Sequence, residues 1–561
     1  MQSAHRLSTV LCAALAVAAM AALRTPLIAA EPTVVAAVGI DGYADIKKQL
    51  GWLGNQVGSP QLPALAESFV MMATQFKGLA GLDPSRPLGV VVSASGNEDE
   101  PVAHMYVPVK DLAKLLDVFK GMTGPAQQVG DKRVLALPNG MRLEVAEKDG
   151  WAIIAPQGSD AGPAAPEKII AALVDDFSIG VRLFPSAMPE GMRERVKNMA
   201  EEAVERAAEQ GQQVDPAAVA LGLQSLETVE TLTFGVAIDE PGDQVFLESR
   251  TVMVPGTPAA AGWSAAAKSD AGLGLPAAAD GKPAAARAHY THDIEAANRL
   301  AIEATLVQLL PAGTGDPITD SLFGIVQDLA GAMLDAGGLD AGLVIDTSKA
   351  DGDHPLPAVT LSARIQDGPA LEKQLKNRLG NEGALPPQAT MKFDAGTEAG
   401  ANLHRLTIDI SELPQAQVVG DELVATLAVA NDRAYLLFGG DVATQLAAAV
   451  AAGKQPAASS KPLMGVDLSV ASLLGYAARM SERFNPEDPA SEALERVAAE
   501  IADKPSTLVQ LLVRPIERGG SIRLAVDAGA LQALSSAVTV QSINAQQFDG
   551  ALPPGVPALA P

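Results

Sequence analysis

The feature that most constrains this chain is an order of secondary-structure elements that occurs twice along its length. The first set of elements runs from about Pro32 to Val254, and the second runs from about Ala284 to Val540. Each set opens with a short apolar strand, followed by an amphipathic helix whose large apolar residues recur at spacings of three and four. A repeated order of about nine elements indicates an internal duplication, although the identity between the two segments is low.

The expected elements correspond pair by pair. The first strands are 34–38 and 286–290, and the first helices carry Leu62, Leu65, Phe69, Met72 and Phe76 in one copy and Ile318, Leu322, Ile325, Leu329 and Met333 in the other. Both helices are expected to end at a glycine, in Gly81-Leu82-Asp83 and Gly338-Leu339-Asp340. Two-stranded hairpins follow at 89–107 and 342–363.

The later elements also agree in type and order. Second helices follow Pro108 and start at Pro369, with proline near the first helical position in both. Short strands then form a meander that contains 133–137 and 151–154 in one copy and 404–408 and 435–438 in the other. Each copy closes with a strand, a charged Ala-rich helix and a hairpin, which are 179–183, 192–210 and 232–249 against 464–468, 490–502 and 508–526.

This pattern predicts an α+β protein made of two tandem copies of a mostly antiparallel β-sheet, with helices packed on one face. The segment between the copies is almost all Ala, Gly, Pro and Ser, with Trp263 as its one large aromatic residue, and is expected to be a flexible linker. The predicted division is a signal peptide at 1–30, a first α+β repeat domain at 31–255, the linker at 256–285, a second α+β repeat domain at 286–543 and a disordered tail at 544–561.

The first thirty residues have the composition of an export signal. Arg6 gives a positive start, and an uncharged run rich in Ala, Leu and Val follows from Leu7 to Leu23. The small residues Ala29 and Ala30 suit a signal peptidase, so cleavage is predicted near Ala30. An uncleaved N-terminal anchor is the alternative, since the run is at the short limit for a membrane span. A periplasmic or secreted location is therefore expected, with no further membrane span.

Composition excludes several kinds of chemistry. The only cysteine, Cys12, lies inside the export signal, so the mature chain would contain no disulfide, thiolate nucleophile or Cys-ligated metal. The net charge of −25, with no Lys/Arg cluster, disfavours nucleic-acid binding. Aromatic residues make up only 4% of the chain, so aliphatic cores are expected.

No catalytic constellation is recognised in the sequence. The sequence from Val92 to Gly96 lacks the first glycine of a serine-hydrolase elbow, and there is no phosphate loop or dinucleotide turn. His289 and His292 would point to opposite sides of a strand, which disfavours a metal site. We therefore assign no catalytic, cofactor-binding or metal-binding residue and no cofactor.

Other polar and aromatic features have ordinary structural interpretations. The acidic turns at 98–100 and 351–353 lack the full spacing of a calcium loop and are expected to be solvated hairpin turns. The alternating Glu and Arg of 193–210 are typical of a solvated helix face, with a partner-binding face as the minority option. Trp52 and Trp151 lie in patterned elements and are expected in the core, whereas Trp263 is expected to be exposed.

A stretch of the first half resembles a planctomycete-type family of secreted proteins of unknown function. The resemblance is sharpest over residues 75–155 and rests on Lys77 to Asp83, Arg86 to Val92, Val107 to Leu112 and Gly150 to Ile153. The second half keeps only the pattern of elements. The resemblance implies export and fold and carries no activity or functional residue.

These observations lead to an expected function class rather than a reaction. The first hypothesis is an exported, non-catalytic binding or scaffold protein of the cell envelope, whose partner is an unknown protein or envelope component. Two linked copies could engage a repetitive partner with a raised effective concentration. The alternative is a carrier of an apolar small molecule or lipid in a cavity between sheet and helices. An enzyme that uses scattered carboxylates is the third and least favoured option.

Overall fold

A computed structural model describes most of the chain between residues 33 and 536. The described ranges are 33–94, 101–159, 165–209, 225–268, 283–293, 317–350, 355–381, 384–412, 420–453, 462–484, 489–501 and 506–536, with the single positions 223, 416 and 504. The chain divides into two compact units. The first unit ends at Ser264 and also contains residues 516–522, and the second contains residues 265–515 and continues from Arg523. The division falls inside the segment expected to be a linker.

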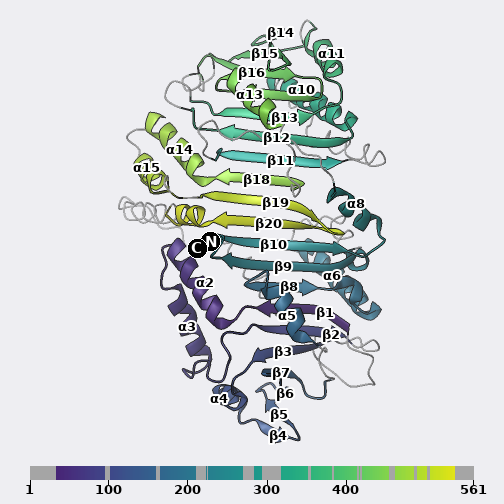
Figure 1. The fold of residues 1–561 in the computed structure, drawn as a ribbon, viewed down its shortest axis with the longest axis vertical. Coiled ribbons are helices and arrows are strands. Elements are labelled where there is room, and N and C mark those ends of the chain that lie inside the picture. Colours follow the sequence, from purple (N-terminus) through teal and green to yellow (C-terminus); the bar gives the residue numbers. More distant parts are fainter. Residues whose placement is uncertain are drawn as a thin grey trace. The chain divides into compact units, whose positions relative to one another are not determined.

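Ten strands of the first unit pair with one another, and these pairings are antiparallel. They are β1 (Thr33–Ile40), β2 (Leu88–Ala94), β3 (Val102–Pro108), β4 (Gln127–Val129), β5 (Lys132–Ala136), β6 (Arg142–Lys148), β7 (Trp151–Pro156), β8 (Ile179–Leu183), β9 (Val229–Asp239) and β10 (Gln244–Met253). Their order across the sheet is β4-β5-β6-β7-β3-β2-β1-β8-β9-β10 (Figure 1).

The second unit repeats this order with the next ten strands. They are β11 (Ala286–Asp293), β12 (Gly338–Asp346), β13 (Ala358–Arg364), β14 (Ala389–Glu398), β15 (Ala401–Asp409), β16 (Glu422–Val429), β17 (Arg433–Phe438), β18 (Met464–Ser469), β19 (Leu508–Ile516) and β20 (Gly519–Asp527). Their pairings give β14-β15-β16-β17-β13-β12-β11-β18-β19-β20 (Figure 1). The mostly antiparallel α+β class is therefore present in both units.

The strand registers agree as well as the order. A row of paired residues crosses seven strands in each unit, and the two rows are Val181-Val38-Val90-Met105-Ile154-Val145-Arg133 and Val466-Ala288-Leu343-Leu361-Leu436-Leu427-His404. Most segment pairs expected from the sequence coincide with these rows. The pairs 34–38 with 286–290 and 151–154 with 435–438 are two residues out of register, a shift that keeps side chains on the same face.

Helices pack on both faces of the first unit's sheet, whereas one face was expected. Its helices are α2 (Tyr43–Gln56), α3 (Leu62–Ala73), α4 (Leu112–Thr123), α5 (Pro166–Val174), the 3-10 turn η1 (Pro185–Ala187), α6 (Glu190–Glu209) and α8 (Pro258–Ala266). Leu112 and Leu115 of α4 pack with Ala152, and Ile170 of α5 packs with Trp151. Because Trp151 and Ala152 are neighbours in β7, their side chains point to opposite faces. The expectation of a one-sided sheet was therefore wrong.

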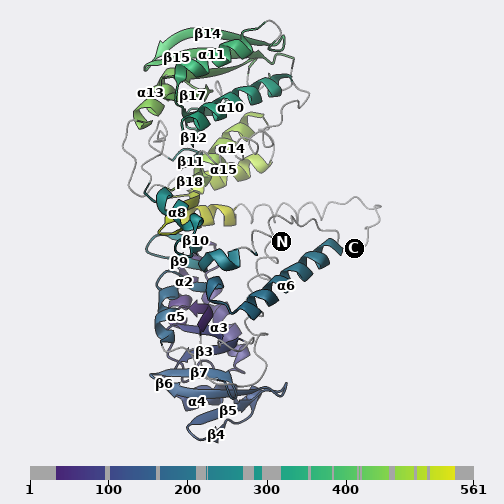
Figure 2. The same cartoon turned by 90° about the vertical axis from the view of Figure 1, so that its right-hand side faces the viewer.

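The second unit is covered on both faces in the same way. Its helices are α10 (Pro317–Asp335), α11 (Gly368–Leu379), α13 (Val442–Gly453), α14 (Val470–Phe484) and α15 (Pro489–Ile501). Ala434 of β17 packs in the cluster of α10 and α11, and its neighbour Tyr435 packs with Leu446 of α13. Figure 2 shows α10 and α13 on opposite sides of the strands. The core of each unit thus consists of two layers of side chains, one on each side of the sheet.

A row of glycines brings α5 close to the first sheet. Gly89, Gly39, Gly180 and Gly235 are aligned across β2, β1, β8 and β9. A Cβ at Gly39 would lie 3.0 Å from Cβ of Leu173, and a Cβ at Gly235 would collide with the ring of Phe177. Because these glycines have no side chains, α5 and Phe177 can pack directly against the backbone of the sheet.

Several helix ends differ from the sequence expectation. Helix α3 ends at Ala73, before the glycines, and α10 ends at Asp335 while Gly338 opens β12. Pro108 is the last residue of β3, and α4 begins after the N-cap Asp111, so only Pro369 lies near a helix start. Helix α14 was not expected at all. Its apolar residues continue directly from β18, which hides the boundary between strand and helix.

The expected flexible linker begins with a helix. Residues 258–266 form α8, and Trp263 is half-buried rather than exposed. Its ring lies against Gly520, where a Cβ would be 2.5 Å from Cη2 of the indole. A glycine with no side chain therefore provides the surface on which Trp263 packs. Residues 269–282 of the expected linker lie outside the described part of the chain.

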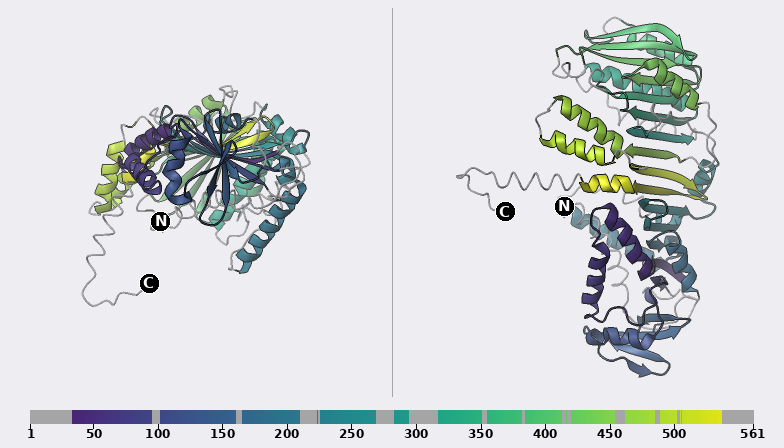
Figure 3. Two further views of the ribbon diagram at one scale, coloured as in Figure 1. Left: turned by 90° about the horizontal axis from the view of Figure 1, so that it is seen from below. Right: turned by 60° about the vertical axis from the view of Figure 1, so that its left-hand side comes forward.

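The apolar stripe of α3 faces solvent. Leu65, Phe69 and Met72 are each more than half exposed, although their spacing predicted a buried face. Phe76, expected on the same stripe, follows the end of the helix and is exposed as well. Helix α3 packs against α2 instead through its other side, and the two helices lie side by side in Figure 3. A stripe of large exposed apolar residues on one helix is uncommon on a monomer.

Four features expected at the ends and turns fall on residues outside the described ranges. The signal peptide at 1–30, the tail at 544–561 and the acidic turns at 98–100 and 351–353 are all in this group. Across the described ranges, the helices are too short or too polar to cross a bilayer.

Candidate functional site

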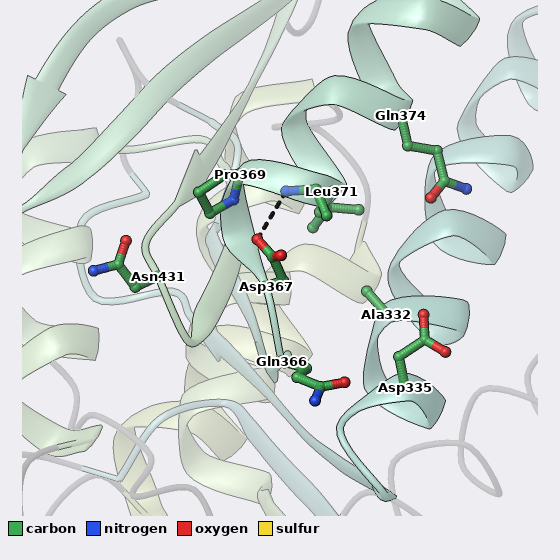
Figure 4. Close-up of a pocket in the computed structure, with 9 residues that line it drawn as sticks. Ala332, Asp335, Gln366, Asp367, Pro369, Leu371, Gln374 and Asn431 are labelled. Atoms are coloured by element: carbon green, nitrogen blue, oxygen red, sulfur yellow. Dashed lines mark hydrogen bonds between the residues drawn. The ribbon is translucent and has the colours of Figure 1, made fainter.

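A pocket of about 720 Å³ opens between α10 and α11 in the second unit. It is lined by Ala332, Asp335, Gln366, Asp367, Pro369, Ala370, Leu371, Gln374 and Asn431 (Figure 4). Five of these side chains are amides or carboxylates, and Leu371 is the one large apolar residue that contributes to the wall. The lining holds no Lys, Arg, His, Ser or Cys.

The first turn of α11 forms one side of the pocket. Asp367 is the N-cap, and its Oδ1 accepts a hydrogen bond of 3.0 Å from the backbone N–H of Ala370, as is usual for an aspartate at this position. The N–H of Gly368 donates to the carbonyl of Asn431 at 2.9 Å. This bond joins the start of the helix to the turn between β16 and β17 and places Asn431 at the pocket.

A buried carboxylate lies next to the pocket on the facing stripe of α10. Asp328 is 3% exposed, and it lies one helical turn before Ala332 of the pocket wall. Its Oδ1 accepts a bond of 2.6 Å from Nε2 of Gln374 and lies 2.6 Å from Nη2 of Arg378. Its Oδ2 has no hydrogen-bond partner. Burial raises the pKa of Asp328, while Arg378 and Gln374 oppose that rise.

Arg378 is held against α10 by a backbone contact as well. Its Nη1 donates to the carbonyl of Gly324 at 2.8 Å. A Cβ at Gly324 would lie 2.7 Å from that same nitrogen, so the missing side chain gives the guanidinium its place. Gly324, Asp328 and Ala332 thus form one stripe of α10. Gly324 contacts Arg378, Asp328 contacts Arg378 and Gln374, and Ala332 lines the pocket.

A second polar cluster uses another side of α11. Glu372 and Lys376 of this helix meet Asp394 of β14 and Asn402 and His404 of β15. Nζ of Lys376 lies 2.8 and 2.9 Å from the two oxygens of Asp394. Asn402 donates to both carboxylates, at 3.2 Å to Glu372 and 2.7 Å to Asp394. Asp394 lies in a β-bulge with a φ of 50°, a conformation that aspartate tolerates.

His404 is the buried member of this cluster. It is 1% exposed, and burial lowers the pKa of its ring, against the opposing effect of Glu372. Nδ1 accepts a bond of 3.2 Å from the backbone N–H of Asp394. The neutral ring therefore carries its proton on Nε2. That nitrogen has no hydrogen-bond partner and lies 3.7 Å from Oε1 of Glu372.

The cluster is poorly arranged for a metal ion. The ligand atoms of Glu372, Asp394 and His404 come within 4.8 Å of one another, which is close enough to consider an ion. However, a metal needs a deprotonated nitrogen. Nδ1 of His404 already accepts from the N–H of Asp394, and Nε2 carries the proton of the neutral ring. The ammonium of Lys376 also neutralises Asp394. Both oxygens of Asp394 and Oε2 of Glu372 accept hydrogen bonds from Lys376 or Asn402 without an ion.

The histidines considered in the sequence have separate surroundings. His289 and His292 both lie in β11, three residues apart, so their side chains point to opposite faces as expected. Nε2 of His289 lies 3.2 Å from the carbonyl oxygen of Pro462. His292 is exposed, with its ring near that of Tyr290. They do not combine into a site.

The tryptophans and the charged helix mostly follow expectation. Trp151 is buried beside Tyr106, and Arg86 lies over its ring. Trp52 is half-buried in α2. Helix α6 carries ion pairs along its surface, between Lys197 and Glu194 and between Arg206 and Glu202. The expectation of a solvated face is confirmed by the exposure of most of its charged side chains.

Two of these polar residues, Glu372 and Gln374, have apolar equivalents on α4 of the first unit. When the N-cap residues Asp111 and Asp367 are aligned, Leu116 and Val118 fall at the positions of Glu372 and Gln374. Leu116 and Val118 are both buried. The pocket-side polar network is therefore a feature of the second unit.

Sequence reasoning missed this site, although one signal was present. Asp328 falls between Ile325 and Leu329 of the stripe expected to be buried. A carboxylate on such a stripe is uncommon unless it is paired. His404, Glu372 and Asp394 carried no comparable signal, because a strand bulge and a helix bring them together.

Comparison with protein-family models, with curated proteins and with solved structures gives no match to this chain. The site is therefore interpreted from its own geometry.

Proposed function

We propose that this chain is an exported, non-catalytic binding protein whose second unit takes up a polar ligand in the pocket between α10 and α11. The lining of the pocket carries the proposal. It offers carboxylates and amides that can hold a ligand by hydrogen bonds. It contains none of the Ser, Cys, Lys or His side chains that most often act as nucleophile or general base near neutral pH.

The same lining favours this function over the alternative of an apolar carrier. Binding sites for apolar molecules are walled mostly by hydrophobic and aromatic side chains. Here Gln366, Gln374 and Asn431 line the space together with two carboxylates. A ligand without hydrogen-bonding groups would leave these side chains desolvated and unpaired, at a cost of roughly 1–3 kcal/mol for each group.

We further propose that the two units are copies of one ancestral domain. The shared strand order and the matching register rows support this. The difference between Leu116 and Glu372 indicates that only the second copy has acquired the polar network. In this proposal the first copy presents the exposed stripe of α3, and ligand uptake belongs to the second copy.

The pocket proposal is tested by blocking the pocket. Ala370 lines the space and is exposed, so Ala370→Trp should fill the space without disturbing the core. Ala447→Trp, at an exposed position of α13 in the same unit, is the matched control. The full chain and both variants are screened by NMR against amino acids, monosaccharides, polyamines and short peptides.

We expect at least one compound to perturb the full chain and the Ala447→Trp variant but not the Ala370→Trp variant. Equal melting temperatures for the two variants would show that both are folded. If the Ala370→Trp variant responds to every compound that the unmodified chain binds, or if the unmodified chain binds none, the pocket has no binding role.

A further inference from the structure

We propose that the exposed stripe of α3 is the interface through which two copies of this chain form a symmetric dimer. The stripe consists of Leu65, Phe69 and Met72 on the helix and Phe76 in the turn that follows it. The inference goes beyond the proposed binding function, because it concerns the first unit and is independent of the pocket. It rests on where exposed apolar surface is concentrated, on the charges around that surface and on its area.

Exposed apolar side chains are concentrated on this stripe. Within the described ranges, five large apolar side chains are at least 57% exposed, and four of them are the members of the stripe. The fifth is Met199 on α6. Single exposed apolar residues are normal on a protein surface, whereas a contiguous group marks an interaction site. The stripe is therefore the part of the first unit best suited to contact another molecule.

The turn after α3 holds Phe76 in an unfavourable backbone conformation. Its φ is 64°, in the left-handed region that bulky side chains rarely adopt, and its N–H donates to the carbonyl of Met71 at 2.6 Å. The ring is 77% exposed, so packing within the chain does not offset this strain. Strained residues are retained mostly at functional positions. A contact with another molecule would give the ring the packing that the single chain lacks.

The exposed side of α3 carries no charge. Glu67 is the one charged residue of the helix, and it lies about 200° around the helix axis from Leu65, at about 100° per residue. There its Oε2 lies 3.0 Å from Nζ of Lys47 on α2. The chain as a whole has a net charge of −25, so most surfaces of two copies repel each other. An uncharged apolar face is where two copies can meet.

The same charges argue against other occupants of the stripe. A helix that lies in a membrane interface usually carries Lys or Arg on its polar side, and α3 has neither. A charged peptide would be recognised through opposite charges, which the stripe does not offer. A second copy needs no such charges, because the same patch on both partners is self-complementary in a two-fold interface. The second copy is therefore the partner that the stripe fits.

The spacing and the area of the stripe suit a pair of helices. Its four residues follow one another at intervals of four, three and four, the spacing by which helices interlock their side chains in coiled coils. A covered phenylalanine buries about 200 Å², so the stripe presents on the order of 500 Å² in each copy. Two copies would bury on the order of 1,000 Å², the lower size limit of specific interfaces. We therefore expect a dimer that dissociates on dilution.

Sedimentation velocity over a range of protein concentrations tests the inference. The protein is purified from the envelope fraction of an expressing bacterium, and we expect it to shift from monomer to dimer as its concentration rises. Phe69→Glu and Leu65→Glu should each weaken the dimer at least about tenfold, because carboxylates would be desolvated at the interface without partners. Phe69→Leu keeps an apolar side chain and should keep most of the dimerisation.

Met199→Glu is the matched control, since it adds the same charge at an apolar position with the same 57% exposure as Leu65. It should leave the dimer unchanged. Melting temperatures measured on dilute protein show whether each variant is folded. Because Phe69 and Leu65 are both exposed in the single chain, a glutamate at one of them at least should leave the fold intact.

Several results would overturn the inference. A protein that stays monomeric at every concentration has no dimer interface. A dimer that neither glutamate variant of the stripe weakens uses another surface, and a dimer that Met199→Glu weakens equally responds only to net charge. Neutral phosphatidylcholine vesicles are the remaining probe. If the monomer binds them and Phe69→Glu abolishes that binding, the stripe docks on lipid and the second copy is the wrong partner.

Discussion

Nε2 of Gln374 donates a hydrogen bond of 2.6 Å to Oδ1 of Asp328, so a side chain at the pocket wall contacts a carboxylate that is almost fully buried. This bond fixes the orientation of the Gln374 amide. It also links the pocket wall to the interface between α10 and α11, where Arg378 makes the second contact to Asp328.

Asp328→Asn should change how stability depends on pH. Burial raises the pKa of Asp328 in the folded chain, so the folded state binds this proton more tightly than the unfolded state. The resulting stabilisation is complete below the unfolded pKa and is lost as pH rises through the folded pKa. We expect the free energy of unfolding of Asp328→Asn, relative to the unmodified chain, to rise over that range and level off above the folded pKa.

Urea denaturation between about pH 3.5 and pH 7 measures this difference. Asp421→Asn, at an exposed aspartate, is the control. Curves for Asp328→Asn that run parallel to those of the unmodified chain would show that burial does not perturb this carboxyl.

Gly235→Ala should destabilise the first unit. The added methyl would collide with the ring of Phe177, and forcing extra atoms into a packed core costs about 1–3 kcal/mol. Gly262→Ala is the control, because a Cβ there meets nothing within 4 Å and alanine favours the helix by about 1 kcal/mol. Chemical denaturation followed by circular dichroism compares them. Equal stabilities would mean that Phe177 moves aside without cost.

Phe69→Ser should leave stability nearly unchanged. Phe69 is 67% exposed on α3, so its removal should alter the free energy of unfolding by no more than about 0.5 kcal/mol. Val91→Ala, at a position with no exposure, should cost at least about 1 kcal/mol in the same unit. A loss for Phe69→Ser as large as that of Val91→Ala would place Phe69 in a packed interface.

Export predicts a shortened mature chain. When the full sequence is expressed in a bacterium, the envelope fraction should contain a protein that begins near Glu31, because Ala29 and Ala30 form the expected cleavage site. N-terminal sequencing of the purified protein decides this. A protein that keeps Leu7 to Leu23 in the membrane fraction would support an uncleaved anchor instead.

Much of the strand layout could be predicted from the sequence. Alternating and continuous apolar runs located sixteen of the twenty strands and missed β4, β6, β14 and β16. Segments such as 102–107 and 358–363 were paired in the observed register. The covering of both faces was not expected, although Leu88 to Val92 is a continuous apolar run. Such runs are typical of strands that are buried on both sides.

The candidate site could not be predicted in the same way. Its residues come from two helices and the turn at Asn431, and their contacts depend on tertiary packing rather than on local spacing. The exposed stripe of α3 shows the converse problem. Its spacing indicates an apolar face, but periodicity does not say whether another element covers that face.

The glycine row limits how the two units could be recombined. His289 occupies the register position of Gly39, and its ring lies against Gly465. A chimeric domain that carried β11 in place of β1 would therefore push an imidazole into Leu173 of α5. Transplanted strands would have to bring their own covering helix with them, so the unit of exchange between the halves is a strand with its helix rather than a single strand.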